Sequence, residues 1–142
     1  MPLCLSAGAA AAVVAASAFT LAWTHSIEKT RWEEDWLVEG AYLRVVAARI
    51  QGSGAGMEPP ADAILRGGTW HYRPKVAPLP RLLLSHSPYA GSYELCVNGI
   101  CRPVGDYLAR LASEATLALV PCASGKTEET SAPDDADRRL RQ

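Results

Sequence analysis

The sequence has no excess of either charge. Fourteen Lys and Arg residues are balanced by fifteen Asp and Glu residues, the net charge is -1 and the pI is near 6.3. The basic residues are scattered until the last five positions, so the chain lacks the concentrated positive charge that binds nucleic acid. With 142 residues, of which 49% are hydrophobic, the chain is long enough for one ordinary core, and we expect a single domain.

Long apolar segments are also lacking, apart from residues 3–18, which are almost wholly apolar. One interpretation is a secretory signal, because small residues fit a cleavage site after Ala18. No Lys or Arg precedes this alanine-rich segment, which argues against a signal, and it is too short and too weakly apolar for a membrane span. The alternative, which we favour, is two retained strands over residues 3–6 and 13–16, joined through Gly8.

Four cysteines are too few to define a disulfide scaffold by number alone, so their positions decide their role. Asn98-Gly99 is a preferred pair for a two-residue hairpin turn, and this turn places Cys96 opposite Cys101. If the pair next to the turn is hydrogen-bonded, the cysteines form a non-hydrogen-bonded pair with Cα atoms close enough for a disulfide. Further ligands at metal-site spacing are lacking nearby, so we favour a disulfide over zinc.

The other two cysteines, Cys4 and Cys122, lie near the two ends of the expected folded region. A disulfide between them would close nearly the whole domain. Cleavage after Ala18 would remove Cys4 and leave Cys122 alone, which favours retention of the first strand.

Alternating apolar and polar residues predict a mainly β fold. Phe19, Leu21, Trp23 and His25 alternate with small residues, which indicates a half-buried strand over residues 19–26. Further strand segments are expected over residues 34–38, 42–50, 64–66, 69–72, 81–85, 93–103 (as a hairpin) and 115–120.

The hairpin of residues 34–38 and 42–50 is expected to follow a polar connection over residues 27–33. On its first strand Trp36 and Val38 are expected to share one face with Glu34, and on its second strand Leu43, Val45 and Ala47 are expected to share one face. We expect a small antiparallel β-sandwich or barrel-like domain over residues 1–122. It would contain one short helix over residues 106–111 and be followed by a disordered polar tail over residues 123–142.

The most unusual local composition lies in residues 50–60, where Gly52, Gly54 and Gly56 alternate before Pro59-Pro60. The segment lacks the GxGxxG spacing and the Lys-Ser/Thr pair of phosphate-binding loops, and prolines follow where those motifs require a helix. A nucleotide site is therefore not predicted. Of the remaining interpretations, we favour a bulged turn between strands over an anion-binding nest of successive amides.

His25 is expected to point inward at the end of a strand, where it needs a polar partner such as Glu34 or a loop amide. With the glycine loop it defines a candidate pocket for a ligand or a partner. The candidate binding residues are His25, Glu28, Glu34, Ser53, Gly54, Gly56 and Glu58.

Catalytic chemistry is not indicated by these residues. Ser26 lacks a nucleophile elbow and faces away from His25 on a strand, so a Ser-His-acid triad is not predicted. His25, His71 and His86 have no standard metal-ligand spacing. We therefore expect no catalytic residue, no metal and no cofactor.

Three segments together resemble a bacterial family called domain of unknown function 1850. They read Thr-His-Ser-Ile-Glu-Lys-Thr with Trp-Glu-Glu at residues 24–34, Gly-Ser-Gly-Ala-Gly-Met-Glu-Pro-Pro at residues 52–60, and Trp-His-Tyr-Arg-Pro at residues 70–74. The resemblance covers about residues 3–122. It implies an association with TRAP transporters of the TAXI type, which import organic acids with an extracytoplasmic binding protein. It carries no catalytic residue over to this chain.

These observations lead to three functional hypotheses. The first is an extracytoplasmic accessory domain, without a transmembrane span of its own, that binds a ligand or a TRAP/TAXI subunit near residues 52–60. The alternative is a hydrolase-like or metal-dependent enzyme that uses His25 with Glu28 or Glu58. The third is a purely structural interaction module.

Overall fold

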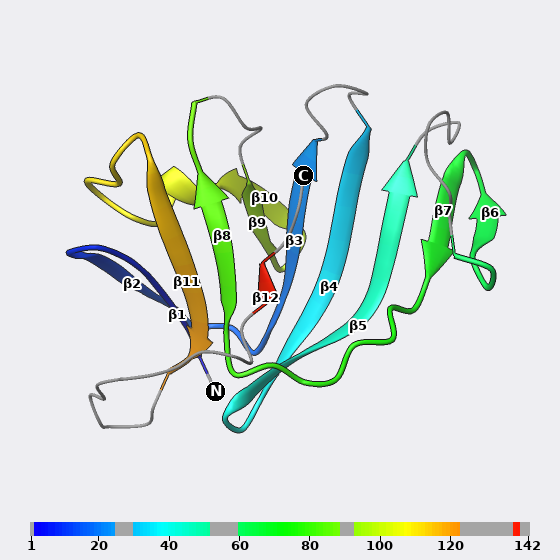
Figure 1. Cartoon of the computed structure of the whole chain (residues 1–142), viewed down its shortest axis with the longest axis horizontal. Helices are drawn as coiled ribbons and strands as arrows, with labels where there is room; N and C mark the ends of the chain where they lie inside the picture. The colour runs from blue at the N-terminus through cyan, green and yellow to red at the C-terminus, as the bar shows by residue number, and fades with distance from the viewer. Residues whose placement is uncertain (1, 25–29, 52–59, 89–92, 123–137, 140–142) are drawn as a thin grey trace.

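The computed structural model describes residues 2–24, 30–51, 60–88, 93–122 and 138–139. These residues form two β-sheets whose apolar faces share one core (Figure 1). All strand pairs are antiparallel except the one that the last short strand makes. The mainly β prediction is confirmed, and neither sheet of the described residues closes into a barrel.

The smaller sheet has five strands. Its order is β12 (Arg138–Arg139), β8 (Leu82–His86), β11 (Ala115–Pro121), β1 (Leu3–Ala7) and β2 (Ala10–Val14). β12 runs parallel to β8 and is the described part of the expected tail; residues 123–137 and 140–142 lie outside the described residues, so disorder there stays a prediction. β1 and β2 form the expected first hairpin, but β2 begins at Ala10 rather than at Val13.

The larger sheet has seven strands. Its order is β10 (Ile100–Pro103), β9 (Glu94–Val97), β3 (Ala18–Thr24), β4 (Arg31–Glu39), β5 (Tyr42–Gln51), β7 (Thr69–Tyr72) and β6 (Ile64–Arg66). β4 begins at Arg31, so the expected polar connection ends earlier than predicted. The three extra residues, Arg31 to Glu33, pair with the end of β3, and Trp32 and Glu33 also pair with the end of β5.

The core lies between the two sheets. Leu5 and Leu119 of the smaller sheet and Leu21 and Trp36 of the larger sheet are each at most 1% exposed. Leu5, Trp36 and Leu119 alternate along their strands with more exposed neighbours, as one buried face requires, whereas Ala22 next to Leu21 is also buried. The apolar alternation that indicated strands therefore also defines the core.

Tight turns connect the hairpins as the sequence predicted. Asn98 and Gly99 have φ of 54° and 81°, the pattern of a type I′ turn. This turn pairs Cys96 with Cys101, and the two residues form a disulfide with Cα atoms 3.8 Å apart. Both predicted disulfides are present, since Cys4 is bonded to Cys122 across a sequence separation of 118.

A β-bulge corrects the predicted face of β5. Trp36 pairs with Val45 and Asp35 pairs with Ala47, so Val46 has no partner on β4. The inward face therefore passes from Val45 to Ala48, which is 2% exposed, and the prediction that Ala47 shares a face with Leu43 and Val45 is wrong.

The expected helix over residues 106–111 is replaced by a single 3-10 turn over Val104–Asp106. The amides of Tyr107 and Leu108 both bond to the carbonyl of Val104, but Arg110 has φ of 65°, which a continuing helix does not allow. Leu108 of this segment is 1% exposed and belongs to the core, although the helix is absent.

Candidate functional site

Most of the predicted binding residues lie outside the described residues. They are His25, Glu28, Ser53, Gly54, Gly56 and Glu58. The pocket that they would form stays a prediction. Glu34 is the one predicted binding residue that the structure describes.

The described ends of the neighbouring strands show where these segments leave the larger sheet. Thr24, the last residue of β3, pairs with Arg31, the first residue of β4. On the other side of β4, Trp32 pairs with Ile50, next to the last residue of β5 (Figure 1). The segments of residues 25–29 and 52–59 therefore follow β3 and β5, which flank β4, at the same end of the sheet, as the candidate pocket requires.

Glu34 is the one buried charged side chain among the described residues, with 6% exposure. It points to the inner face of the larger sheet, between Leu21 of β3 and Ala48 of β5. Its Oε1 accepts a hydrogen bond of 3.2 Å from Nε1 of Trp36. Because burial of a carboxylate costs free energy, a buried carboxylate at a sheet end is a candidate functional group.

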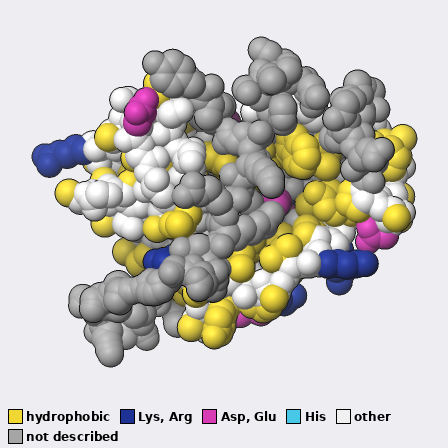
Figure 2. Space-filling view, in the orientation of Figure 1, with side chains coloured by type: hydrophobic (Ala, Val, Ile, Leu, Met, Phe, Trp, Pro, Cys, Tyr) yellow, Lys and Arg dark blue, Asp and Glu magenta, His cyan; other side chains and the backbone are white. Residues whose placement is uncertain are grey.

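Aromatic side chains form a row across the same end of the inner face. The rings of Trp23 and Trp32 stack with centroids 6.0 Å apart, and the ring of Tyr93 is 5.6 Å from that of Trp23. Cross-strand pairing continues the row from Trp32 through Ile50 to Trp70. In Figure 2, a small acidic area near the middle of the view lies next to hydrophobic side chains.

Two donors in this row have no hydrogen-bond partner within the described structure. They are the buried indole Nε1 atoms of Trp23 and Trp32. A buried N–H without an acceptor is unfavourable, and a ligand oxygen would satisfy it. This cluster was not predicted from the sequence, because Trp32 was expected to lie in a connection. The spacing of Trp32, Glu34 and Trp36 at every second residue is typical of a strand and could have placed Trp32 in β4.

The outer face of the same strands carries a network of ion pairs. Arg49 of β5 donates two hydrogen bonds of 2.8 Å to Asp35 and a third of 2.8 Å to Glu33, while Thr20 donates one of 2.6 Å to Asp35. These hydrogen bonds, chiefly those from Arg49, lower the pKa of Asp35 although burial opposes ionisation. The network holds β3, β4 and β5 together on the side away from the core.

Arg31 extends this network towards β9. It bonds to Glu33 at 2.8 Å and to Glu94 at 3.1 Å. Burial raises the pKa of Glu33, but the hydrogen bonds from Arg31 and Arg49 outweigh burial, and the pKa is lowered. Since both arginines are already paired with carboxylates, this face offers an anionic ligand little uncompensated positive charge.

A small hollow of about 170 Å³ lies beside these ion pairs. Its lining residues are Arg31, Glu33, Arg49, Gln51, Thr69 and His71. His71 is directly opposite Arg49 in the pairing of β5 with β7, on the outer face. Among the described residues, no three His, Cys, Asp or Glu side chains lie together in a way that could hold a metal ion.

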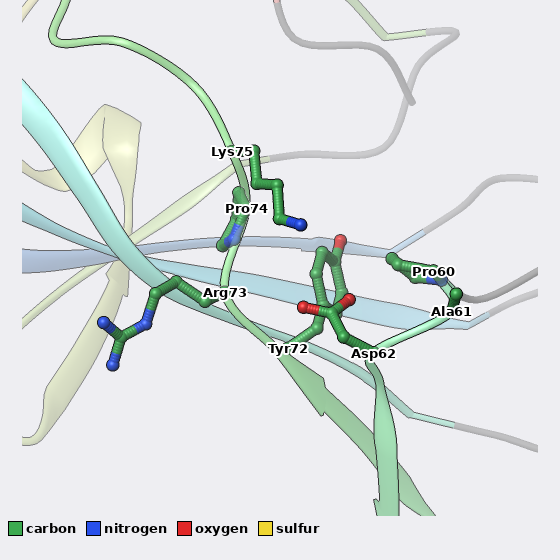
Figure 3. Close-up of a pocket in the computed structure, with 7 residues that line it drawn as sticks. All are labelled: Pro60, Ala61, Asp62, Tyr72, Arg73, Pro74 and Lys75. Atoms are coloured by element: carbon green, nitrogen blue, oxygen red, sulfur yellow. The ribbon is translucent and has the colours of Figure 1, made fainter.

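A larger hollow of about 360 Å³ borders the end of the glycine loop. It lies between Pro60 to Asp62 and Tyr72 to Lys75 (Figure 3). Lys75 and Tyr72 direct their polar ends to the same side, Asp62 lies beside the Tyr72 ring, and Arg73 points away. The hollow therefore has one cation and one carboxylate next to an aromatic ring, at the edge of the loop that the sequence singled out.

Two packed β-sheets and two disulfides define a small disulfide-bridged β domain. The chain belongs to the family described as domain of unknown function (DUF1850), whose model matches residues 19–104. The expected family is thus confirmed. No curated protein and no solved structure matches the chain. In the described part of the chain, no helix has the length and apolarity to cross a lipid bilayer.

Proposed function

We propose that this protein is a β-sandwich accessory domain that works with an organic-acid transport system of the TRAP (TAXI) type. In this proposal it binds a ligand or a transporter subunit at the end of the larger sheet where residues 25–29 and 52–59 leave β3 and β5. The transporter association rests on the family resemblance.

The observation that carries the binding site is the burial of Glu34 beside unpartnered indole donors. A purely structural sheet end would favour apolar side chains at the position of Glu34, which lies between Leu21 and Ala48. Buried polar groups that converge at an aromatic surface are typical of binding sites. The predicted residues His25 and Glu58 belong to the two segments that begin at this end.

The disulfides support an extracytoplasmic location. All four cysteines are paired in the structure. Disulfides form and persist in oxidising compartments and are rare in the cytosol. We therefore place the domain in the periplasm in this proposal.

The transporter association is tested by recovery of the tagged protein from native membranes. The wild type should bring down a transporter subunit, identified by mass spectrometry. Glu34→Gln should bring down less than a tenth as much, because the substitution removes the buried charge while it keeps an acceptor for Trp36. Glu39→Gln is the matched control, because Glu39 lies at the exposed end of the same strand, and it should behave as the wild type.

A second variant separates loss of folding from loss of binding. Trp32→Phe keeps an aromatic ring against Trp23 and removes one unpartnered donor. It should fold as the wild type and recover less transporter subunit. Failure of the wild type to recover any transporter subunit would refute the proposal.

The enzyme alternative, with His25 and either Glu28 or Glu58, stays a prediction, because all three residues lie outside the described residues. Glu34 is the described group that would serve such chemistry. Hydrolytic activity that is lost in His25→Ala and retained in His71→Ala would favour this alternative over the binding domain.

A further inference from the structure

Four of the described strands lie at the edges of the two sheets, and three of them carry features that discourage pairing with another chain. β12 consists of two arginines. β10 contains Arg102 and Pro103, and β6 has three residues, of which one is Arg66. Charged side chains, proline and short length are the usual protections of an edge strand.

The fourth edge strand, β2, has none of these protections. Its five residues are Ala-Ala-Ala-Val-Val, and none of the described strands pairs with its outer edge. The side chain of Val13 is 67% exposed. An uncharged apolar edge of this kind is a template for pairing with another strand.

The pairing of β2 with β1 determines which backbone groups are free. The turn at Gly8 and Ala9 makes Ala7 and Ala10 the pair that closes the hairpin, with Gly8 at φ of 60°. Closing pairs of two-residue hairpins are hydrogen-bonded, and hydrogen-bonded pairs alternate with non-hydrogen-bonded pairs. The N–H and C=O groups of Ala11 and Val13 therefore point away from β1, to the open edge.

We propose that β2 pairs antiparallel with β2 of a second copy of this chain, about a two-fold axis at Ala12. In this register Ala11 faces Val13 of the second copy and Val13 faces Ala11, so all outward backbone groups at these positions are satisfied in four hydrogen bonds. The two smaller sheets join into one continuous sheet. Closed two-fold pairing of this kind is the commonest form of self-association.

The side chains of β2 fit a second copy better than an unrelated chain. The two-fold register places small residues opposite small residues, with Ala12 opposite itself and Ala11 opposite the exposed Val13. Residues 7–16 contain no charged side chain, so the symmetric contact brings no like charges together.

Sedimentation velocity of the full chain over a wide range of concentration tests the proposal. The wild type should show a reversible monomer–dimer equilibrium. Ala11→Pro should raise the dimer dissociation constant about tenfold or more, because it removes an outward N–H from each copy. The same proline leaves the ladder to β1 intact, so the melting temperature measured at low concentration should stay close to that of the wild type.

Charged substitutions provide a matched pair. Val13→Lys should also abolish the dimer, because it places two lysines on the shared edge. Ile64→Lys introduces the same charge at an apolar residue of the edge strand β6, where Ile64 is 59% exposed, and should leave the dimer unchanged. Hydrogen exchange should show protection of the Ala11 and Val13 amides in the wild type at dimer concentrations and rapid exchange in Val13→Lys.

Three results would overturn the proposal. The first is a wild type that stays monomeric at every concentration with rapid exchange of the Ala11 and Val13 amides. The second is a dimer that survives Ala11→Pro and Val13→Lys but is lost in Ile64→Lys, which would assign the contact to β6. Protection of the Ala11 amide only after addition of a foreign extended peptide would assign the edge to another chain and would equally refute the pairing of two copies.

Discussion

The two disulfides should contribute very different amounts to the free energy of unfolding. One joins residues near the two ends of the domain, and the other joins the two strands of one hairpin. Cys4 and Cys122 are 118 residues apart, whereas Cys96 and Cys101 are five residues apart. In the loop-entropy description, the first bridge stabilises by about 4.9 kcal/mol and the second by about 2.1 kcal/mol. The difference arises in the unfolded chain, where the long bridge removes far more conformations.

The assay is thermal unfolding of Cys4→Ala/Cys122→Ala and of Cys96→Ala/Cys101→Ala. For a chain of 142 residues, the melting temperatures should fall by about 16 °C and about 7 °C, respectively. Alanine is chosen because Cys122 is 9% exposed and a serine hydroxyl would be buried there. Reduced wild type is the control and should melt close to a variant that lacks all four cysteines.

Equal losses from the two pairs, or a larger loss from the short bridge, would refute the loop-entropy reasoning. In that case the contribution of each bridge would lie in the folded state, through local packing of the strand ends. Intact mass measured with and without reductant checks beforehand that each variant retains the other bridge.

The remaining predictions concern the larger sheet. Arg49→Met should lower the free energy of unfolding by about 1–2 kcal/mol, because it removes three charge-assisted hydrogen bonds to part-buried carboxylates. Arg44→Met, which breaks an exposed ion pair, should lower it less. Chemical denaturation measures both changes. The pKa of Asp35 is lowered in the folded protein, so the ionised carboxylate stabilises the fold above the ordinary carboxyl pKa. This stabilisation is lost as the pH falls through the lowered pKa. Arg49→Met should therefore make the free energy of unfolding less dependent on pH in the acid range. Deletion of Val46 should leave a cooperative fold, because it removes the unpaired residue of the bulge. Deletion of Ala48 should abolish folding, because the β5 residues on one side of the deletion would turn to the opposite face of the sheet. Cooperative unfolding of the Ala48 deletion would contradict the assigned register.

Local patterns in the sequence were sufficient for much of the secondary structure. The strand that contains Phe19, Leu21 and Trp23 alternates strongly enough to predict its buried face. Asn98-Gly99 fixed a turn type, and the turn type fixed the register of the two cysteines beside it. Such predictions succeed because a tight turn and a period of two depend on neighbouring residues alone.

The errors occurred where a distant contact overrides the local pattern. The polar residues 27–33 were expected to form a connection. Arg31 and Glu33 nevertheless lie in β4, where Arg49 and Glu94 pair with them from other strands. The residues after Asp106 have a helical pattern of apolar side chains, but no helix follows the 3-10 turn of Val104–Asp106, because Arg110 has a positive φ.

The candidate site divides in the same way. The sequence placed Glu34 on one face with Trp36, and this agrees with the structure. That Glu34 binds a ligand or a partner stays a prediction. It did not indicate that Trp23, Trp32 and Tyr93 form one aromatic cluster, because their contact requires β9, β3 and β4 to be neighbours.

By itself the sequence determined that this protein is a β domain, that its hairpins turn where glycine or asparagine permits positive φ, and which cysteines pair. Those properties follow from backbone geometry within a few residues, or from the even number and end positions of the cysteines. Only the tertiary structure decided the order of the strands, the bulge at Val46, the burial of Glu34 and the open edge of β2. Each of these features depends on which strands are neighbours in the sheets. The strand order is stabilised by contacts between side chains that are far apart in the sequence, so no local pattern reveals it.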